Sequence, residues 1–134
     1  MNSANIINQL NGMPPERLKK FWFSAMRIAR SGNGDVETAR KMLDEIEAIE
    51  RGRVRPKPSD VVGALLFEPH GHGYVSFGYA DGACVVTVRK TEQHRLSGNR
   101  VYEVKVLGQT LPEASRSIDE ARQVAANEYS SRQG

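Results

Sequence analysis

The spacing of apolar residues changes once along this chain. Over residues 14–50 apolar side chains recur every three or four positions, and from residue 62 onward short segments alternate apolar and polar side chains. The first period is typical of an amphipathic helix, and the second is typical of a strand with one buried face. The pattern therefore predicts a helical first half and a second half that is rich in strands.

Turn and capping residues divide the first half into three expected helices. A short helix is expected over residues 3–10. A second helix is expected over residues 14–30 and begins at Pro14 and Pro15, because proline is tolerated in the first helical turn. The segment Ser-Gly-Asn-Gly ends this second helix, and Asp35 can cap a third that continues to about residue 50. The second and third helices are thus predicted to form an αα-hairpin.

Four strands and a final helix are expected in the second half. The strands are predicted near residues 62–68, 74–79, 83–90 and 101–107. Asp81-Gly82 supplies a hairpin turn, and Ser117 with Glu120 fits a helix capping box. The connections are too short for parallel crossovers. The predicted fold class is α+β, with an N-terminal helical hairpin followed by a four-stranded antiparallel meander covered by a C-terminal helix.

Charge separates the two halves as well. The 134 residues carry a net charge of +3, but residues 1–58 hold 11 basic and 7 acidic side chains, whereas residues 59–134 hold 8 and 9. We expect a helical segment over 1–50, a basic Pro-containing linker over 51–60, and the sheet with its C-terminal helix over 61–134. A single compact domain that includes the helices is the alternative. The basic excess favours an acidic partner.

The cysteine content and the length of the apolar segments exclude some classes of protein. Cys84 is the only cysteine, which excludes an internal disulfide, and its alternation with Val86 and Val88 predicts a small core residue. No apolar segment is long enough to span a bilayer, and the first residues do not resemble a signal peptide. We expect a cytoplasmic protein that does not bind membranes and uses no cofactor.

Basic residues surround an aromatic side chain on the second predicted helix. Phe23 lies about 100° around the helix from Trp22, beside the apolar stripe. The cations on that side are Lys19, Lys20, Arg27 and Arg30. A ring among cations can stack on a base while the cations contact phosphates, and the same patch suits an acidic protein surface. In the alternative, Phe23 packs internally and the cations are simply solvated.

The linker is the second candidate contact. Its cations are Arg51, Arg53, Arg55 and Lys57. Arg51-Gly52-Arg53 resembles the core of an AT-hook, although Val54 stands where that motif has proline. The resemblance implies insertion into the DNA minor groove. A solvated linker is the alternative interpretation.

Two patterns in the sequence are candidates for a metal-binding site. Glu103-Val104-Lys105, with Asp81 upstream, resembles the PD-(D/E)xK nucleases, which implies carboxylates on a divalent metal and a lysine that orients water. The same alternation is ordinary for a half-solvated strand. The three histidines, His70, His72 and His94, are too few and too loosely placed for a convincing zinc site, so we interpret the first two as turn residues.

From these patterns we expect a non-enzymatic binding protein. It would act through its basic helical half on nucleic acid, or on a protein that handles nucleic acid. A small inhibitor or adaptor of a host nuclease complex, of the kind mobile elements use, is one alternative. The metal-dependent nuclease is another. Pairing of the amphipathic helices in a homodimer is a further alternative for the mode of assembly.

Overall fold

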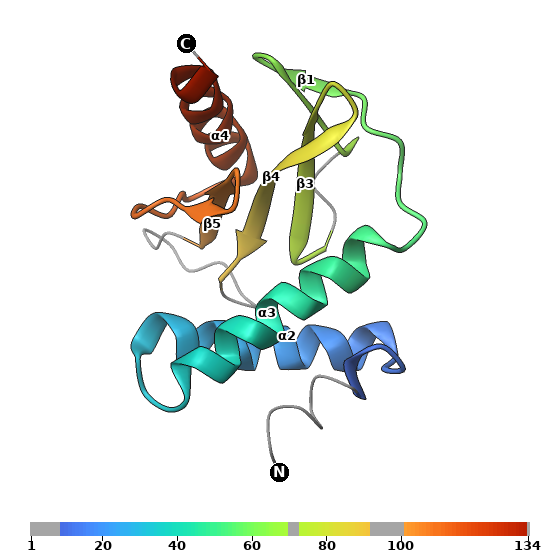
Figure 1. The fold of residues 1–134 in the computed structure, drawn as a ribbon, viewed down its shortest axis with the longest axis vertical. Helices are drawn as coiled ribbons and strands as arrows, with labels where there is room; N and C mark the ends of the chain where they lie inside the picture. The colour runs from blue at the N-terminus through green and yellow to red at the C-terminus, as the bar shows by residue number, and fades with distance from the viewer. Residues whose placement is uncertain (1–8, 70–72, 92–100, 134) are drawn as a thin grey trace. The chain divides into compact units, whose positions relative to one another are not determined.

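The computed structural model describes residues 9–69, 73–91 and 101–133. The chain divides into two compact units, Met1–Arg53 and Val54–Gly134, and Figure 1 labels most of their helices and strands. The first unit is helical, and the second contains a sheet and one helix. Within the described residues, no helix is long and apolar enough to cross a membrane.

The first unit is the helical hairpin that the sequence predicts. Helix α2 spans Pro15–Ser31 and helix α3 spans Val36–Arg51. Helix α2 ends at Gly32, which adopts a left-handed conformation with φ 76° that glycine accepts at little cost. The carboxylate of Asp35 accepts the backbone N–H of Thr38 at 3.1 Å and so caps α3 as expected. Most of the helix expected over residues 3–10 lies outside the described residues.

Helices α2 and α3 pack against each other along their apolar faces. The largest fully buried apolar side chains of these two helices are Leu18, Trp22, Met26, Leu43 and Ile46. Full burial of one such side chain contributes roughly 1.5–3 kcal/mol. The three- and four-residue spacing seen in the sequence therefore corresponds to the packed stripe of the hairpin.

The second unit is a six-stranded antiparallel meander with a C-terminal helix. In chain order its strands are β1 (Asp60–Val62), β2 (Leu65–Phe67), β3 (Val75–Ala80), β4 (Ala83–Lys90), β5 (Tyr102–Val106) and β6 (Gln109–Thr110). Each strand pairs with the next in the chain. The α+β class, the antiparallel meander and the C-terminal helix are confirmed, but the number of strands is six rather than four.

Two short hairpins account for the additional strands. The single strand expected over 62–68 is instead the β1–β2 hairpin, because Gly63 adopts φ 59° and starts a two-residue turn. Strand β6 follows a turn in which Leu107 and Gly108 both have positive φ, at 50° and 82°. Leucine is an unusual residue for that conformation, so the sequence carried only a weak turn signal there.

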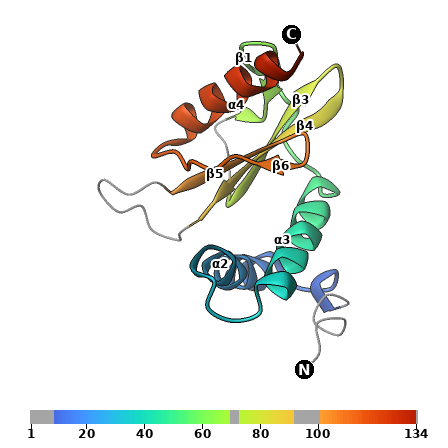
Figure 2. The ribbon, with the colours of Figure 1, turned by 60° about the vertical axis from the view of Figure 1, so that its left-hand side comes forward.

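Helix α4, Ile118–Gln133, covers one face of this sheet, as Figure 2 shows. Ser117 accepts the N–H of Glu120 at 3.1 Å, which confirms the predicted cap. The buried core between α4 and the sheet comprises Leu65, Phe67, Val86, Val88, Val104, Val106, Ala121, Ala125 and Ala126. The alanines of α4 let the helix approach the larger side chains of the strands closely.

The prediction that Cys84 is a core residue is wrong, because this side chain is exposed. The register between β3 and β4 shifts from Gly78 opposite Val86 to Tyr79 opposite Cys84, so β4 carries an extra residue there. Such a bulge breaks the two-residue alternation on which the prediction depended. Asp81-Gly82 forms the β3–β4 turn with positive φ at both residues, as the sequence predicts.

Candidate nucleic-acid interface

The basic character of the first unit belongs to one helix. Helix α2 contains five basic residues and one acid, Glu16, whereas α3 contains three basic and five acidic residues. The basic residues of α2 are Arg17, Lys19, Lys20, Arg27 and Arg30, and all five are exposed. The sequence indicated a basic helical half, and the structure narrows this to α2.

Four cations of α2, namely Arg17, Lys19, Lys20 and Arg27, form no ion pair with another residue in the described part of the chain. Lys19, Lys20 and Arg27 are the three of these that the sequence places around Phe23. Lys20 and Arg27 are seven positions apart, so they lie on the same side of α2 and are separated by roughly 10 Å along its axis. Their charges are therefore held at a defined spacing on a regular helix.

Phe23 does not offer a stacking surface. Its side chain is only 5% exposed, and that of the adjacent Trp22 is fully buried. A ring stacks on a nucleic-acid base only when one face is open to solvent. The stacking role expected for Phe23 is therefore corrected, and the alternative in which this ring packs internally describes its position.

The four cations of the linker have four different surroundings. Arg51 lies exposed in the last turn of α3, and Lys57 is exposed in the segment before β1. Arg53 forms an ion pair at 2.6 Å with Glu50, whose side chain is 9% exposed. Arg55, which belongs to the second unit, is only 15% exposed and forms an ion pair with Glu68. The even spacing of these residues in the sequence therefore does not produce one continuous basic strip.

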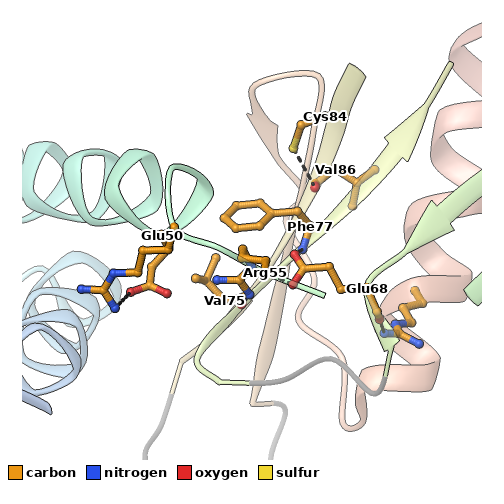
Figure 3. Close-up of polar contacts among 9 residues, drawn as sticks. Glu50, Arg55, Glu68, Val75, Phe77, Cys84 and Val86 are labelled. Carbon is orange, nitrogen blue, oxygen red and sulfur yellow. Dashed lines mark hydrogen bonds and ion pairs between the residues drawn. The ribbon is translucent and has the colours of Figure 1, made fainter. Parts of the chain in front are cut away.

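Arg55 is bound to the sheet by three interactions, shown in Figure 3. Its Nε donates to the Glu68 carboxylate at 2.7 Å, and its Nη2 donates to the Val75 carbonyl at 3.0 Å. The guanidinium also lies 4.9 Å from the centre of the Phe77 ring, within range of a cation–π interaction. Arg55 thus fastens the segment before β1 to strands β2 and β3.

Glu68 is the acid at the centre of this arrangement, and it is not among the site residues expected from the sequence. Its side chain is 1% exposed, and its second carboxylate oxygen accepts the N–H of Phe77 at 3.1 Å. Its backbone carbonyl accepts a hydrogen bond from Arg122 of α4. A carboxylate directly after the apolar segment Leu-Leu-Phe was the available signal, because a buried acid requires a cation.

Of the residues of the nuclease resemblance, Glu103 and Lys105 share strand β5, but Asp81 is not brought near them. Glu103 forms an ion pair with Arg89 at 3.3 Å, near the end of β4. Asp81 lies in the turn before the other end of β4, and the intervening strand separates them by about 20 Å. No group of three potential metal ligands occurs among the residues that the structure describes. His70, His72 and His94 lie outside those residues.

No protein-family model, curated protein or solved structure shows significant similarity to this chain. Function therefore has to be inferred from the surfaces described above. Of the candidate sites, the exposed cations of α2 form the fewest ion pairs with other described residues of the chain. Among the cations of the linker, Arg51 and Lys57 are exposed, and Arg53 and Arg55 form ion pairs with Glu50 and Glu68. Arg51 also interacts within the chain.

Proposed function

We propose that this protein is a non-enzymatic nucleic-acid-binding protein that contacts the phosphate backbone through the basic face of α2. The observation that carries the proposal is the exposure of Lys19, Lys20 and Arg27 without ion pairs to described residues. A cation that contacts a phosphate releases condensed counterions, which favours binding without requiring a particular base sequence. The proposed contact is electrostatic and depends little on sequence.

The linker contributes less than its composition indicates. Arg51 and Lys57 are the exposed cations of the linker and can add phosphate contacts, and Arg51 also interacts within the chain. Arg53 and Arg55 would have to leave Glu50 and Glu68 before they could reach a minor groove. Because the partner acid of Arg55 is buried, that exchange would leave an uncompensated carboxylate and is unfavourable. The proposal therefore gives the main role to α2 and a secondary role to these two linker cations.

Fluorescence anisotropy with labelled nucleic acid tests this proposal. We expect affinity to fall steeply between low and moderate salt, with each lost phosphate contact reducing the log–log salt slope by about 0.9 for duplex DNA. The double variant Lys20→Ser/Arg27→Ser should therefore weaken binding and reduce that slope by about 2. The matched control is Arg40→Ser/Arg116→Ser, which removes two exposed cations outside the proposed site and the same net charge.

Two results would contradict the proposal. One is the absence of binding at low salt, and the other is equal weakening by the α2 variant and its control. A complex with an acidic protein that survives high salt, and that the α2 variant disrupts, would instead favour the inhibitor or adaptor interpretation. In that case the same basic face would recognise a protein surface.

A further inference from the structure

The surroundings of the α2 cations also indicate which form of nucleic acid they fit. We infer that the preferred ligand is double-stranded DNA, contacted on its phosphates; this inference rests on the proposed function. Proteins that bind single strands without sequence preference combine a basic groove with exposed aromatic rings. On α2 the rings of Trp22 and Phe23 are buried and that of Phe21 is half-buried, so no fully exposed ring lies beside the cations.

The remaining exposed side chains of α2 suit phosphates better than bases. Besides the cations, the exposed side chains include those of Glu16, Ser24 and Ser31. Serine hydroxyls can donate to phosphate oxygens. Helix α2 contains no Asn or Gln, the side chains that recognise adenine by two hydrogen bonds. Because the proposed contacts of Lys19, Lys20 and Arg27 are to phosphates, they should position the duplex without selecting its sequence.

The spacing of the cations favours a ligand with regularly placed phosphates. Helix α2 holds Lys20 and Arg27 roughly 10 Å apart along its axis, and the B-DNA major groove is about 12 Å wide. Long side chains readily cover the remaining difference, so the two cations can reach the phosphates on opposite sides of the groove. The deep, narrow major groove of duplex RNA does not present the same arrangement. A single strand would have to be ordered before it matched this fixed spacing.

Competition at constant salt tests the inference. A labelled 20-bp duplex DNA is displaced from the wild-type protein by unlabelled duplex DNA, by single-stranded DNA of the same length, or by duplex RNA. We expect duplex DNA to compete best by several-fold, and AT-rich and GC-rich duplexes to differ by less than about twofold. Lys20→Ser/Arg27→Ser should weaken the binding of duplex DNA more than that of single-stranded DNA, because it removes the cations at the defined spacing.

The outcomes separate this inference from the proposed function. Equal or tighter binding of single-stranded DNA or duplex RNA would overturn the preference for duplex DNA and leave nucleic-acid binding in place. No binding of any of the three would overturn both. Phe23→Leu gives an independent check, with circular dichroism to establish that the variant is folded. Unchanged affinity for single-stranded DNA is expected, whereas a selective loss would show that the ring takes part in binding.

Discussion

The two units of this protein use their charges differently. In the sheet unit, arginines with little exposure are paired with acids: Arg55 with Glu68, Arg89 with Glu103 and Arg122 with Asp60. On α2 of the helical unit the cations are exposed, and four of them form no ion pair with described residues. These arginines of the sheet unit therefore have a structural role, whereas the proposal assigns the cations of α2 to binding.

This difference shows why a row of cations in a sequence is a weak predictor of a binding site. Arg55 and Lys57 are two residues apart in the same basic segment, yet Lys57 is exposed and Arg55 is bound to a buried carboxylate. An arginine with such a partner would lose that interaction before it gained a phosphate contact. The acids near each cation in the fold decide which cations are available.

The largest effect is expected where a structural cation is removed. Arg55→Met should lower the free energy of unfolding by about 3 kcal/mol, near the lower end for a broken buried pair, because it leaves the Glu68 carboxylate buried without its cation. Chemical denaturation followed by circular dichroism measures this change. Arg40→Met provides the matched control, since Arg40 is exposed on α3.

A second variant separates the buried charge from the loss of packing. Adding Glu68→Gln to Arg55→Met removes the uncompensated charge and should recover part of the lost stability, while the amide oxygen can still accept the N–H of Phe77. If Arg55→Met were no more destabilising than Arg40→Met, the pair would have no structural role. The Arg55–Glu68 pair would then no longer support the view that charges in the sheet unit stabilise the fold.

A smaller effect is expected from a purely steric change in the sheet unit. A Cβ atom placed on Gly78 would lie 2.6 Å from a ring carbon of Phe67, too close for an ordinary contact. Gly78→Ala should therefore destabilise the protein by about 1–3 kcal/mol through overpacking. Gly82→Ala changes a glycine with open space around it and tests backbone strain alone, because φ is 82° there. Near-equal stability of wild type and Gly78→Ala would show that the ring shifts freely.

Much of the fold followed from periodicity and turn residues. The helix spacing predicted α2 and α3, and Asp81-Gly82 located the β3–β4 hairpin, because these signals act within a few residues. The β1–β2 hairpin was missed because one glycine, Gly63, interrupts an otherwise continuous apolar segment. The exposure of Cys84 was missed because a bulge depends on pairing between strands, which a single strand's sequence does not encode.

The candidate site was harder to predict than the fold. Lys19, Lys20 and Arg27 are exposed as the polar side of an amphipathic helix should be, which follows from spacing alone. The burial of Phe23 and the pairing of Arg55 with Glu68 depend on packing between segments distant in sequence. Because of these contacts, Phe23 is not part of the exposed site and Arg55 is not an exposed cation of the linker.

A still smaller effect concerns an acid of the helical unit that has a structural role despite its exposure. The Thr38 hydroxyl, with help from the Thr38 N–H, holds the pKa of Asp35 below its ordinary value of 3.8. A carboxyl with a lowered pKa stabilises the fold above its ordinary pKa, and this contribution is lost as the pH falls through the folded value. Asp35→Ala should lower the melting temperature slightly at neutral pH, and the difference should shrink in acid.

The control for Asp35→Ala removes an acid of α3 that has no capping role. Glu45→Ala takes away one exposed negative charge from the same helix and should not reproduce the pH-dependent difference in melting temperature. Thermal melts of the three proteins from pH 7 to pH 3 make the comparison. A difference between wild type and Asp35→Ala that grew in acid would contradict the assignment, because a protonated cap cannot stabilise α3 more than a charged one.

The smallest expected change in stability is also the sharpest test of the contrast. Lys20→Ser/Arg27→Ser removes two exposed cations that have no ion pair to lose among described residues, so each substitution should change the free energy of unfolding by no more than about 0.5 kcal/mol. The same variant is expected to weaken the binding of duplex DNA. Loss of binding with stability retained would separate these cations from Arg55, whose removal should cost stability. Strong destabilisation by Lys20→Ser/Arg27→Ser would instead show that α2 uses its charges internally, and the distinction between the two units would disappear.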